Sequence, residues 1–378
     1  MPAARQSASS SPSAVAGAAA TRPLLPPGAD PGAPLPLLAD PAGYRACEHD
    51  LLADADGRVY WLELFATHID VQLAHAREAG VIDEAGVARA AAEMRAAMDL
   101  LARAPDRHGR LDILVLDSIR RRVLADAGVA DEFRIVKARE NVRAMEGLAA
   151  RCARLDAMDP RGRALAALEG LLAGNLFDMG SRETAARFGG AAPAFEEVLA
   201  ELPERPWHVD HAEAAAKVLV RPPRRTLVLV DNAGADVVLG ALPLARALVH
   251  AGSRVVLAAN AAPSLNDVTA PELRGLLGLA ARIDPMFASD AIAVVDTGSH
   301  APLIDLGSVS DELAAAAAHP DVGLLVLLGM GRAIESNWTA RFTVPTLRVA
   351  MLKDPQVASR IGGRLPGAVV RLDGPAAG

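Results

Sequence analysis

The sequence predicts an α/β protein, in which a Rossmann-like α/β/α domain with a parallel sheet follows an N-terminal all-helical domain. Residues 37–203 space their apolar side chains at intervals of three and four, as amphipathic helices do. Residues 204–378 alternate short runs of Val, Leu and Ile with helical segments, which indicates an α/β domain with a parallel sheet. Residues 1–36 are built from Ala, Ser, Pro and Gly, and we expect a disordered leader because they have little apolar surface to bury.

Helices account for the whole of the first half. The first contains VYWLELFATHIDVQLAHAREA and ends at Gly80, since glycine is favoured just after a helix. Pro160 and Gly162 precede the last one. The expected helices cover residues 59–79 and 87–103, begin near 111 and at 131, and cover 163–172.

Strands appear only after residue 210. Their apolar runs do not alternate with polar residues, as expected for strands buried on both faces. The expected strands cover residues 226–230, 254–259, 291–295, 323–328 and 347–352, and helices 237–251, 271–282 and 311–318 lie between them. Strands separated by helices predict a parallel sheet with right-handed crossovers.

Composition excludes several classes of function. The net charge of −7 and the pI near 5.8 disfavour binding to a phosphate backbone, so we expect no nucleic-acid partner. No run of about 18 apolar residues is present, so we expect no membrane partner. Cys47 and Cys152 are too few for a disulfide scaffold or a cysteine-rich zinc site. Two buried thiols suit a reducing cytoplasm, which is the expected location.

Polar side chains follow every predicted strand. Asp231 and Asn232 follow the first strand, Asp267 lies after the second, Arg332 follows the fourth and Lys353 the fifth. Ligands of open α/β sheets bind beyond the carboxyl ends of the strands. Carboxylate and amide oxygens suit Mg²⁺ or Mn²⁺, while Arg and Lys can hold phosphate oxygens. The pattern predicts metal-assisted chemistry on a phosphate.

Each of these residues also has a purely structural interpretation. The segment DNAGAD (231–236) has the composition of a turn, and Asp236 is favoured as a helix N-cap over a ligand. Asp267, with the asparagine before it, could cap the next helix. Arg332 and Lys353 could be solvated surface charges. The residues alone leave these alternatives open.

Long blocks of the chain carry a resemblance that favours the functional interpretation. These blocks are DNAGADVVLGALPLARALVHAGSRVVLAANAAPSLNDVTAPEL (231–273), KARENVRAM (137–145), LAGNLFDMG (172–180), ERPWHVD (204–210), TGSHAPLIDL (297–306), LGMGRAIESN (328–337) and MLKDPQVASRIGGRL (351–365). From about residue 34 to about 372 the sequence resembles the damage-control phosphatase family, also known as domain-of-unknown-function family 89. It is most similar to the phosphatase domains fused to type II pantothenate kinases in animals and plants.

The resemblance implies a metal-dependent phosphatase. It implies that Asp231, Asn232 and Asp267 hold one divalent cation (Mn²⁺, Co²⁺, Ni²⁺ or Mg²⁺). The implied substrate is a small phosphorylated metabolite, 4'-phosphopantetheine or its oxidised forms, within damage control of coenzyme A metabolism. The Asp-x-Asp signature of aspartyl phosphatases is absent, which lowers the expectation of a covalent route without deciding between it and attack by water.

The resemblance also implies substrate contacts. Asn175 and Asp178 are implied on the helical side, and Arg332 and Lys353 on the sheet side. Without the resemblance, Asn175 and Asp178 would be interpreted as a pair that caps the end of a helix. The resemblance, with the edge position of the residues, assigns catalytic roles to Asp231, Asp267, Arg332 and Lys353.

Two places depart from the family pattern. The small polar loop that members carry after TGS is His300-Ala301 in this chain. Members carry Glu directly before GMGR, where this chain has Leu328. This motivates two alternatives to the leading interpretation: a sugar-phosphate phosphatase of the same fold, and a binding or regulatory relative with weakened catalysis. A carboxyl methyltransferase is the least favoured, since no glycine-rich loop for an adenosyl cofactor follows the first strand. The oligomeric state is not predicted.

Overall fold

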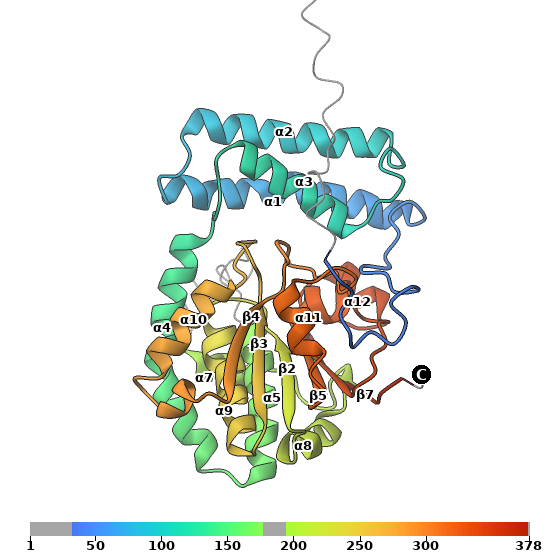
Figure 1. Ribbon diagram of the computed structural model, residues 1–378. Helices are drawn as coiled ribbons and strands as arrows, with labels where there is room; N and C mark the ends of the chain where they lie inside the picture. Colours follow the sequence, from blue (N-terminus) through green and yellow to red (C-terminus); the bar gives the residue numbers. More distant parts are fainter. Residues whose placement is uncertain (1–31, 177–193, 377–378) are drawn as a thin grey trace, which may run out of the picture.

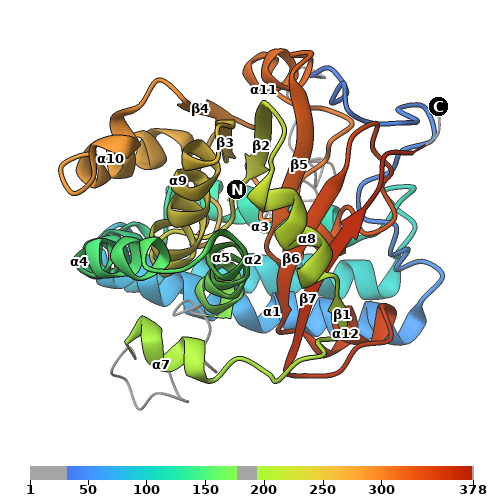
Figure 2. The same cartoon turned by 90° about the horizontal axis from the view of Figure 1, so that it is seen from below.

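The structure is a computed structural model that describes residues 32–176 and 194–376. Its sheet stands below a layer of three helices, α1–α3, which lie across the strand ends (Figure 1). Further helices flank the two faces of the sheet (Figure 2). The α/β fold class predicted from the sequence is confirmed.

The helices of the first half begin and end close to their predicted positions. Side chains of Asp54, Asp83 and Asp112 cap the first three by accepting hydrogen bonds from backbone N–H groups. The bounds are α1 Ala55–Glu78, α2 Glu84–Arg103, α3 Ile113–Asp126, α4 Arg134–Asp156, α5 Pro160–Leu176 and α7 Phe195–Ala200.

The second half forms the sheet and its covering helices. The strands are β1 Val209–Asp210, β2 Arg225–Leu229, β3 Arg254–Ala259, β4 Ile292–Asp296, β5 Val322–Leu328, β6 Thr346–Leu352 and β7 Gly367–Asp373. The helices are α8 Ala212–Val220, η1 Asp236–Ala241, α9 Leu242–His250, α10 Ala270–Ala280, η2 Pro285–Ala288, α11 Asp311–Ala317, η3 Gly331–Glu335 and α12 Pro355–Arg360.

The sheet is mostly parallel, with strand order β1-β7-β6-β5-β2-β3-β4. All five predicted strands are present. The prediction missed β1, which is two residues long, and β7, which pairs antiparallel with β6. The sheet is mostly rather than wholly parallel because β7 follows only the short α12 and returns beside β6 in the opposite direction.

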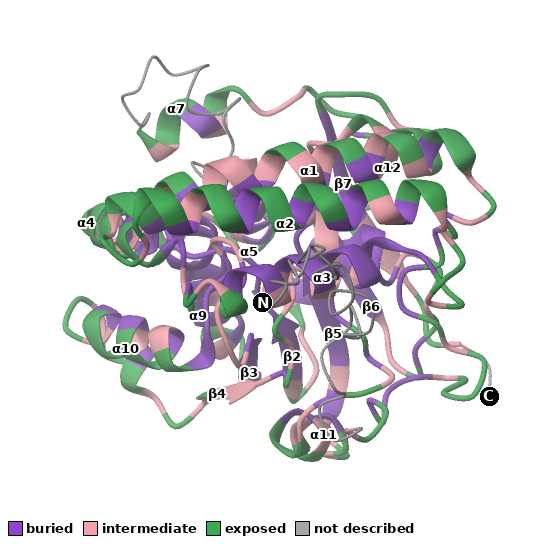
Figure 3. Cartoon of the chain, turned by 90° about the horizontal axis from the view of Figure 1, so that it is seen from above, coloured by how far each residue is buried: buried purple, intermediate pink, exposed green. Residues whose placement is uncertain are grey.

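Strand β2 shows why the central strands are apolar throughout. Leu227 and Leu229 belong to one buried cluster, while Val228 and the next residue, Val230, belong to the other. The first cluster includes residues of α1–α3, α11 and α12, and the second includes residues of α4, α5, α8, α9 and α10. Figure 3 shows exposed stripes on the outer faces of α1, α2 and α4, with mostly buried residues in the strands beneath.

The helices of the first half therefore share both hydrophobic clusters with the sheet. The division into residues 1–36, 37–203 and 204–378 stays a prediction. Cys47 and Cys152 are buried and unpaired, as expected. No helix among residues 32–176 and 194–376 is long and apolar enough to cross a membrane.

Candidate active site at the carboxyl edge of the sheet

A cleft of about 460 Å³ separates the α1–α3 layer from the carboxyl ends of the strands. Its floor includes Asp231, Asn232 and Asp267, and Lys353 lies on its wall. The chain reverses its direction across the sheet here, since β2 has β3 on one side and β5 on the other. Such a switch point is where open α/β sheets bind ligands. The expected convergence of strand ends is present.

Asp231 is the centre of a buried hydrogen-bond network. It lies two residues beyond the end of β2, and its side chain is only 9% exposed. Arg332 Nη1 donates to its Oδ1, while the amide nitrogens of Asn175 and Asn232 each donate to Oδ2 at 2.9 Å. Three donors from three elements thus hold one carboxylate at the floor of the cleft.

Asp267 approaches Asp231 through the backbone. Asn232 and Asp267 form an isolated antiparallel β-bridge, so the loops after β2 and β3 run side by side. Asn260 Nδ2 donates to Asp267 Oδ2 at 3.0 Å, and Arg332 Nη2 donates to the same oxygen at 2.9 Å. The interpretation of Asp267 as a helix cap is wrong, because Thr269 caps α10.

Asp236 is the third buried carboxylate. Its Oδ2 accepts from Asn175 at 3.1 Å and from Asn232 at 3.0 Å. It is the first residue of η1 and makes no capping bond, so the N-cap interpretation is wrong. It reaches the site because Gly174 lets α5 lie against η1: a Cβ there would come within 2.7 Å of the Asp236 Cα.

The three carboxylates carry more negative charge than their surroundings offset. Burial, reinforced by repulsion from Asp231, raises the pKa of Asp236 to about 7. Burial also raises the pKa of Asp267 to about 7, against the opposing attraction of Arg332. The nearby positive groups are Arg332, Lys353 and Lys137, and Lys137 is already paired with two other carboxylates, those of Asp131 and Glu272. The network is therefore suited to accepting further positive charge.

Arg332 lies beneath the cleft floor. It is 0% exposed, it bridges Asp231 and Asp267, and its Nη2 also donates to Asn260 Oδ1 at 2.9 Å. Gly329 makes room for this arrangement, because at φ +85° a Cβ would collide with the Asp231 carboxylate. Here Arg332 acts as a counter-charge for two aspartates. Its assignment as a phosphate contact stays a prediction.

Asn175 and Lys353 meet on the other side of Asp231. Asn175 is 2% exposed, and its Oδ1 accepts from the backbone N–H of Met351 at 3.0 Å. Lys353 Nζ donates to the Asn175 carbonyl oxygen at 3.0 Å and remains partly exposed at the cleft. Asn175 thus joins α5, Asp231 and β6, and its substrate contact stays a prediction. Asp178 lies outside the described residues.

The expected metal site can be judged from its donor atoms. Asp231 and Asp267 supply carboxylate oxygens. The amide nitrogen of Asn232 bonds Asp231 and Asp236, so the amide oxygen of Asn232 can serve as a metal ligand. This all-oxygen set, with its surplus of negative charge, fits a hard divalent cation. Within the described ranges no group of three His, Cys, Asp or Glu residues has a metal-binding arrangement, so a candidate set needs the amide.

Helix α4 supports both acidic loops from behind. Asn141 Oδ1 accepts from the Gly234 backbone N–H at 2.7 Å, and Lys137 forms ion pairs with Asp131 at 2.9 Å and Glu272 at 2.8 Å. Glu272 in turn completes the capping box of α10, directly after the Asp267 loop. The block KARENVRAM therefore positions the site without lining the cleft.

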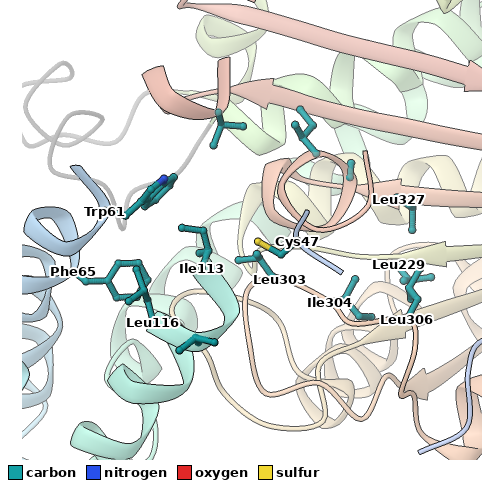
Figure 4. Close-up of a cluster of buried hydrophobic side chains, with 14 of the residues drawn as sticks. Cys47, Trp61, Phe65, Ile113, Leu116, Leu229, Leu303, Ile304, Leu306 and Leu327 are labelled. Atoms are coloured by element: carbon teal, nitrogen blue, oxygen red, sulfur yellow. The ribbon is translucent and has the colours of Figure 1, made fainter. Parts of the chain in front are cut away.

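The opposite wall of the cleft was missed by the sequence reasoning. Tyr60, Trp61 and Phe65 of α1 line it, as does Arg120 of α3. A signal was present: three of the chain's twelve aromatic residues fall within six positions. Their spacing was interpreted only as that of an amphipathic helix. Trp61 and Phe65 do project from one side of α1, as Figure 4 shows.

Two further positions, at and after the end of β5, bear on the site. Leu328, at the family's Glu position, is 2% exposed and belongs to the hydrophobic cluster beneath α5 and α9. Glu335, one helical turn beyond Arg332, lines the cleft and was not singled out from the sequence. Burial, reinforced by repulsion from Asp354, raises the pKa of Glu335 to about 8.

Comparison with known proteins gives a consistent family. The chain is 36% identical to a pantothenate kinase 2 of Arabidopsis thaliana, over 90% of this chain and 42% of that protein. It is 34% identical to a damage-control phosphatase of the same plant, covering 90% of this chain and 97% of that one. It is 30% identical to a mouse 4'-phosphopantetheine phosphatase, covering 90% and 48%. The chain spans about two-fifths of the length of the pantothenate kinase relatives.

Structural comparison supports the same fold. A crystal structure of a DUF89 family protein from Pyrococcus horikoshii matches with a TM-score of 0.59 at 19% identity, covering 82% of this chain and 96% of that one. A sequence profile described as "Damage-control phosphatase ARMT1-like domain" matches residues 65–369, which include Asn175, Asp231, Asn232, Asp267, Arg332 and Lys353. The chain therefore belongs to the damage-control phosphatase family.

Proposed function

We propose that the protein is a divalent-metal-dependent phosphatase that hydrolyses 4'-phosphopantetheine or its oxidised forms to the alcohol and inorganic phosphate. The observation that carries the proposal is the gathering of Asp231, Asn232 and Asp267 at the floor of one cleft. The name of the mouse relative, 4'-phosphopantetheine phosphatase, supports the substrate. The two buried, unpaired cysteines support a cytoplasmic location.

Each residue has a role that follows from its position. Asp231, Asn232 and Asp267 would hold the cation, which would offset negative charge on the phosphoryl group. Arg332 keeps Asp231 and Asp267 in place through buried hydrogen bonds. Lys353 offers the ammonium group at the cleft wall as a point charge for a phosphate oxygen.

The volume of the cleft also suits the size of the proposed substrate. At about 460 Å³, the cleft far exceeds the space of a phosphate alone. Apolar and aromatic side chains of α1 face the acidic floor across it. A phosphomonoester with a long amide-bearing body can place its phosphate at the floor and its body along that wall.

The test is phosphate release with and without added Mn²⁺, Co²⁺, Ni²⁺ or Mg²⁺. The substrates are 4'-phosphopantetheine, its sulfonate, fructose 1-phosphate and a generic aryl phosphate. We expect metal-dependent turnover with the highest kcat/KM on a pantetheine ester. Asp231→Asn should abolish it, whereas Asp70→Asn, which removes a carboxylate paired with Arg95 away from the cleft, is the matched control.

Three results would change the proposal. Full activity after exhaustive chelation would refute the metal site. A higher kcat/KM on fructose 1-phosphate would refute the pantetheine substrate and favour the sugar-phosphate alternative. No turnover on any ester would refute the enzyme and favour a binding or regulatory role, the alternative that Leu328 motivates.

A further inference from the structure

A buried hydrogen-bond donor without a protein partner belongs to a side chain that lines the cleft. Trp61 is 5% exposed and lines the cleft opposite Asp231 and Lys353. Its indole Nε1 has no hydrogen-bond partner among the described residues. Buried polar groups are nearly always paired, and an unpaired one calls for an explanation such as a missing ligand. The indole N–H can only donate, so its partner must be an acceptor.

Neither of the other two tryptophans, Trp207 and Trp338, has a buried indole nitrogen without a hydrogen-bond partner. Trp207 is buried, and its Nε1 donates to the carbonyl oxygen of Pro203 at 2.9 Å. Trp338 is half-buried and packs against the guanidinium of Arg371. Only Trp61 combines a place on the cleft wall with an unpaired indole nitrogen among the described residues.

The position of Trp61 is fixed relative to the acidic floor. The hydroxyl of its neighbour Tyr60 donates to Asp354 Oδ2 at 2.6 Å. Asp354 also caps α12 by accepting from the backbone N–H groups of Gln356 and Val357. Because Asp354 directly follows Lys353, this hydrogen bond connects α1 to the side of the cleft on which Lys353 lies.

We propose that the Trp61 indole N–H donates a hydrogen bond to an acceptor oxygen on the substrate body, which makes Trp61 a specificity-determining residue. The proposal rests on the proposed phosphatase function and extends it to the α1 wall. The ligand class is a phosphomonoester whose body carries an amide carbonyl or a similar neutral acceptor. Tyr60 and Phe65 flank the indole and pack against the apolar parts of such a body.

Trp61→Phe tests the hydrogen bond, since it keeps an aromatic ring and removes the donor. We expect the ratio of kcat/KM on 4'-phosphopantetheine to kcat/KM on an aryl phosphate to fall by about three- to tenfold, the usual worth of one neutral hydrogen bond. The loss should appear in KM rather than in kcat. Trp207→Phe, which removes a paired indole N–H that does not line the cleft, should leave the ratio unchanged.

A second measurement uses the wild-type protein and pantetheine, which has the amide body but no phosphate. In protein with ¹⁵N-labelled tryptophan, pantetheine should shift the indole resonance of Trp61 and leave that of Trp207 in place. An unchanged Trp61 resonance at saturating pantetheine, or an unchanged kcat/KM ratio in a folded Trp61→Phe variant, would overturn the proposal. Absence of phosphate release from any ester would refute the phosphatase function, while the resonance shift would still decide the role of Trp61.

Discussion

Replacing Glu335 by Gln should remove a loss of stability that the protein suffers as the pH rises. Glu335 is 8% exposed, and burial, reinforced by repulsion from Asp354, raises its pKa from 4.5 to about 8. Between these two values the unfolded chain releases the proton and the folded protein keeps it. Folding must therefore take up a proton, so the free energy of unfolding falls as the pH increases from about 4.5 to about 8.

The size of the effect follows from the two pKa values. Each pKa unit corresponds to ~1.4 kcal/mol, so the rise from 4.5 to about 8 gives an upper bound of ~5 kcal/mol. Water entering the cleft can stabilise the ionised carboxylate and lower this value. We expect Glu335→Gln to be ~2–5 kcal/mol more stable relative to wild type at pH 8 than at pH 4.5.

Urea unfolding at several pH values in the presence of a chelator measures this difference. Asp236 and Asp267 titrate in both proteins, so their contributions largely cancel in the comparison. Glu63→Gln, at an exposed carboxylate of α1, is the control for loss of a negative charge. A constant stability difference between Glu335→Gln and wild type from pH 4.5 to 8 would refute the assignment of a buried, protonated Glu335.

Three further outcomes follow from the contacts of the site. Asp267→Ala should abolish metal-dependent turnover. It should also lower the free energy of unfolding by ~3–5 kcal/mol, because it removes one counter-charge of the fully buried Arg332. A free energy of unfolding within about 1 kcal/mol of the wild-type value would contradict this. Asn141→Ala should lower the free energy of unfolding by ~1–2 kcal/mol and speed hydrogen exchange at Gly234, whose N–H loses its acceptor. An unchanged exchange rate at Gly234 would refute the role of this hydrogen bond in holding the loop. Leu328→Glu should lower the Tm by burying a carboxylate in an apolar cluster, without raising phosphate release, whereas an inactive wild type rescued by this variant would identify a degenerate relative.

The sequence by itself determined the secondary structure and the edge at which the chemistry gathers. Apolar periodicity is a local property, so the five predicted strands and the first-half helices appear within a few residues of their expected bounds. Parallel strands separated by helices bring their carboxyl ends to one edge, which is why Asp231, Asn232, Asp267 and Lys353 share a cleft. Both inferences need only the order of residues along the chain.

Tertiary structure decided which partner each polar group has. Arg332 lies below the floor between Asp231 and Asp267, which are 101 and 65 residues away, and the order of residues does not predict this pairing. Asp236 was expected to cap a helix, yet it bonds Asn175, which is 61 residues away on α5. A local pattern predicts burial and periodicity. It carries no information on which distant groups will balance a buried charge, because that balance depends on how the helices and the sheet finally pack.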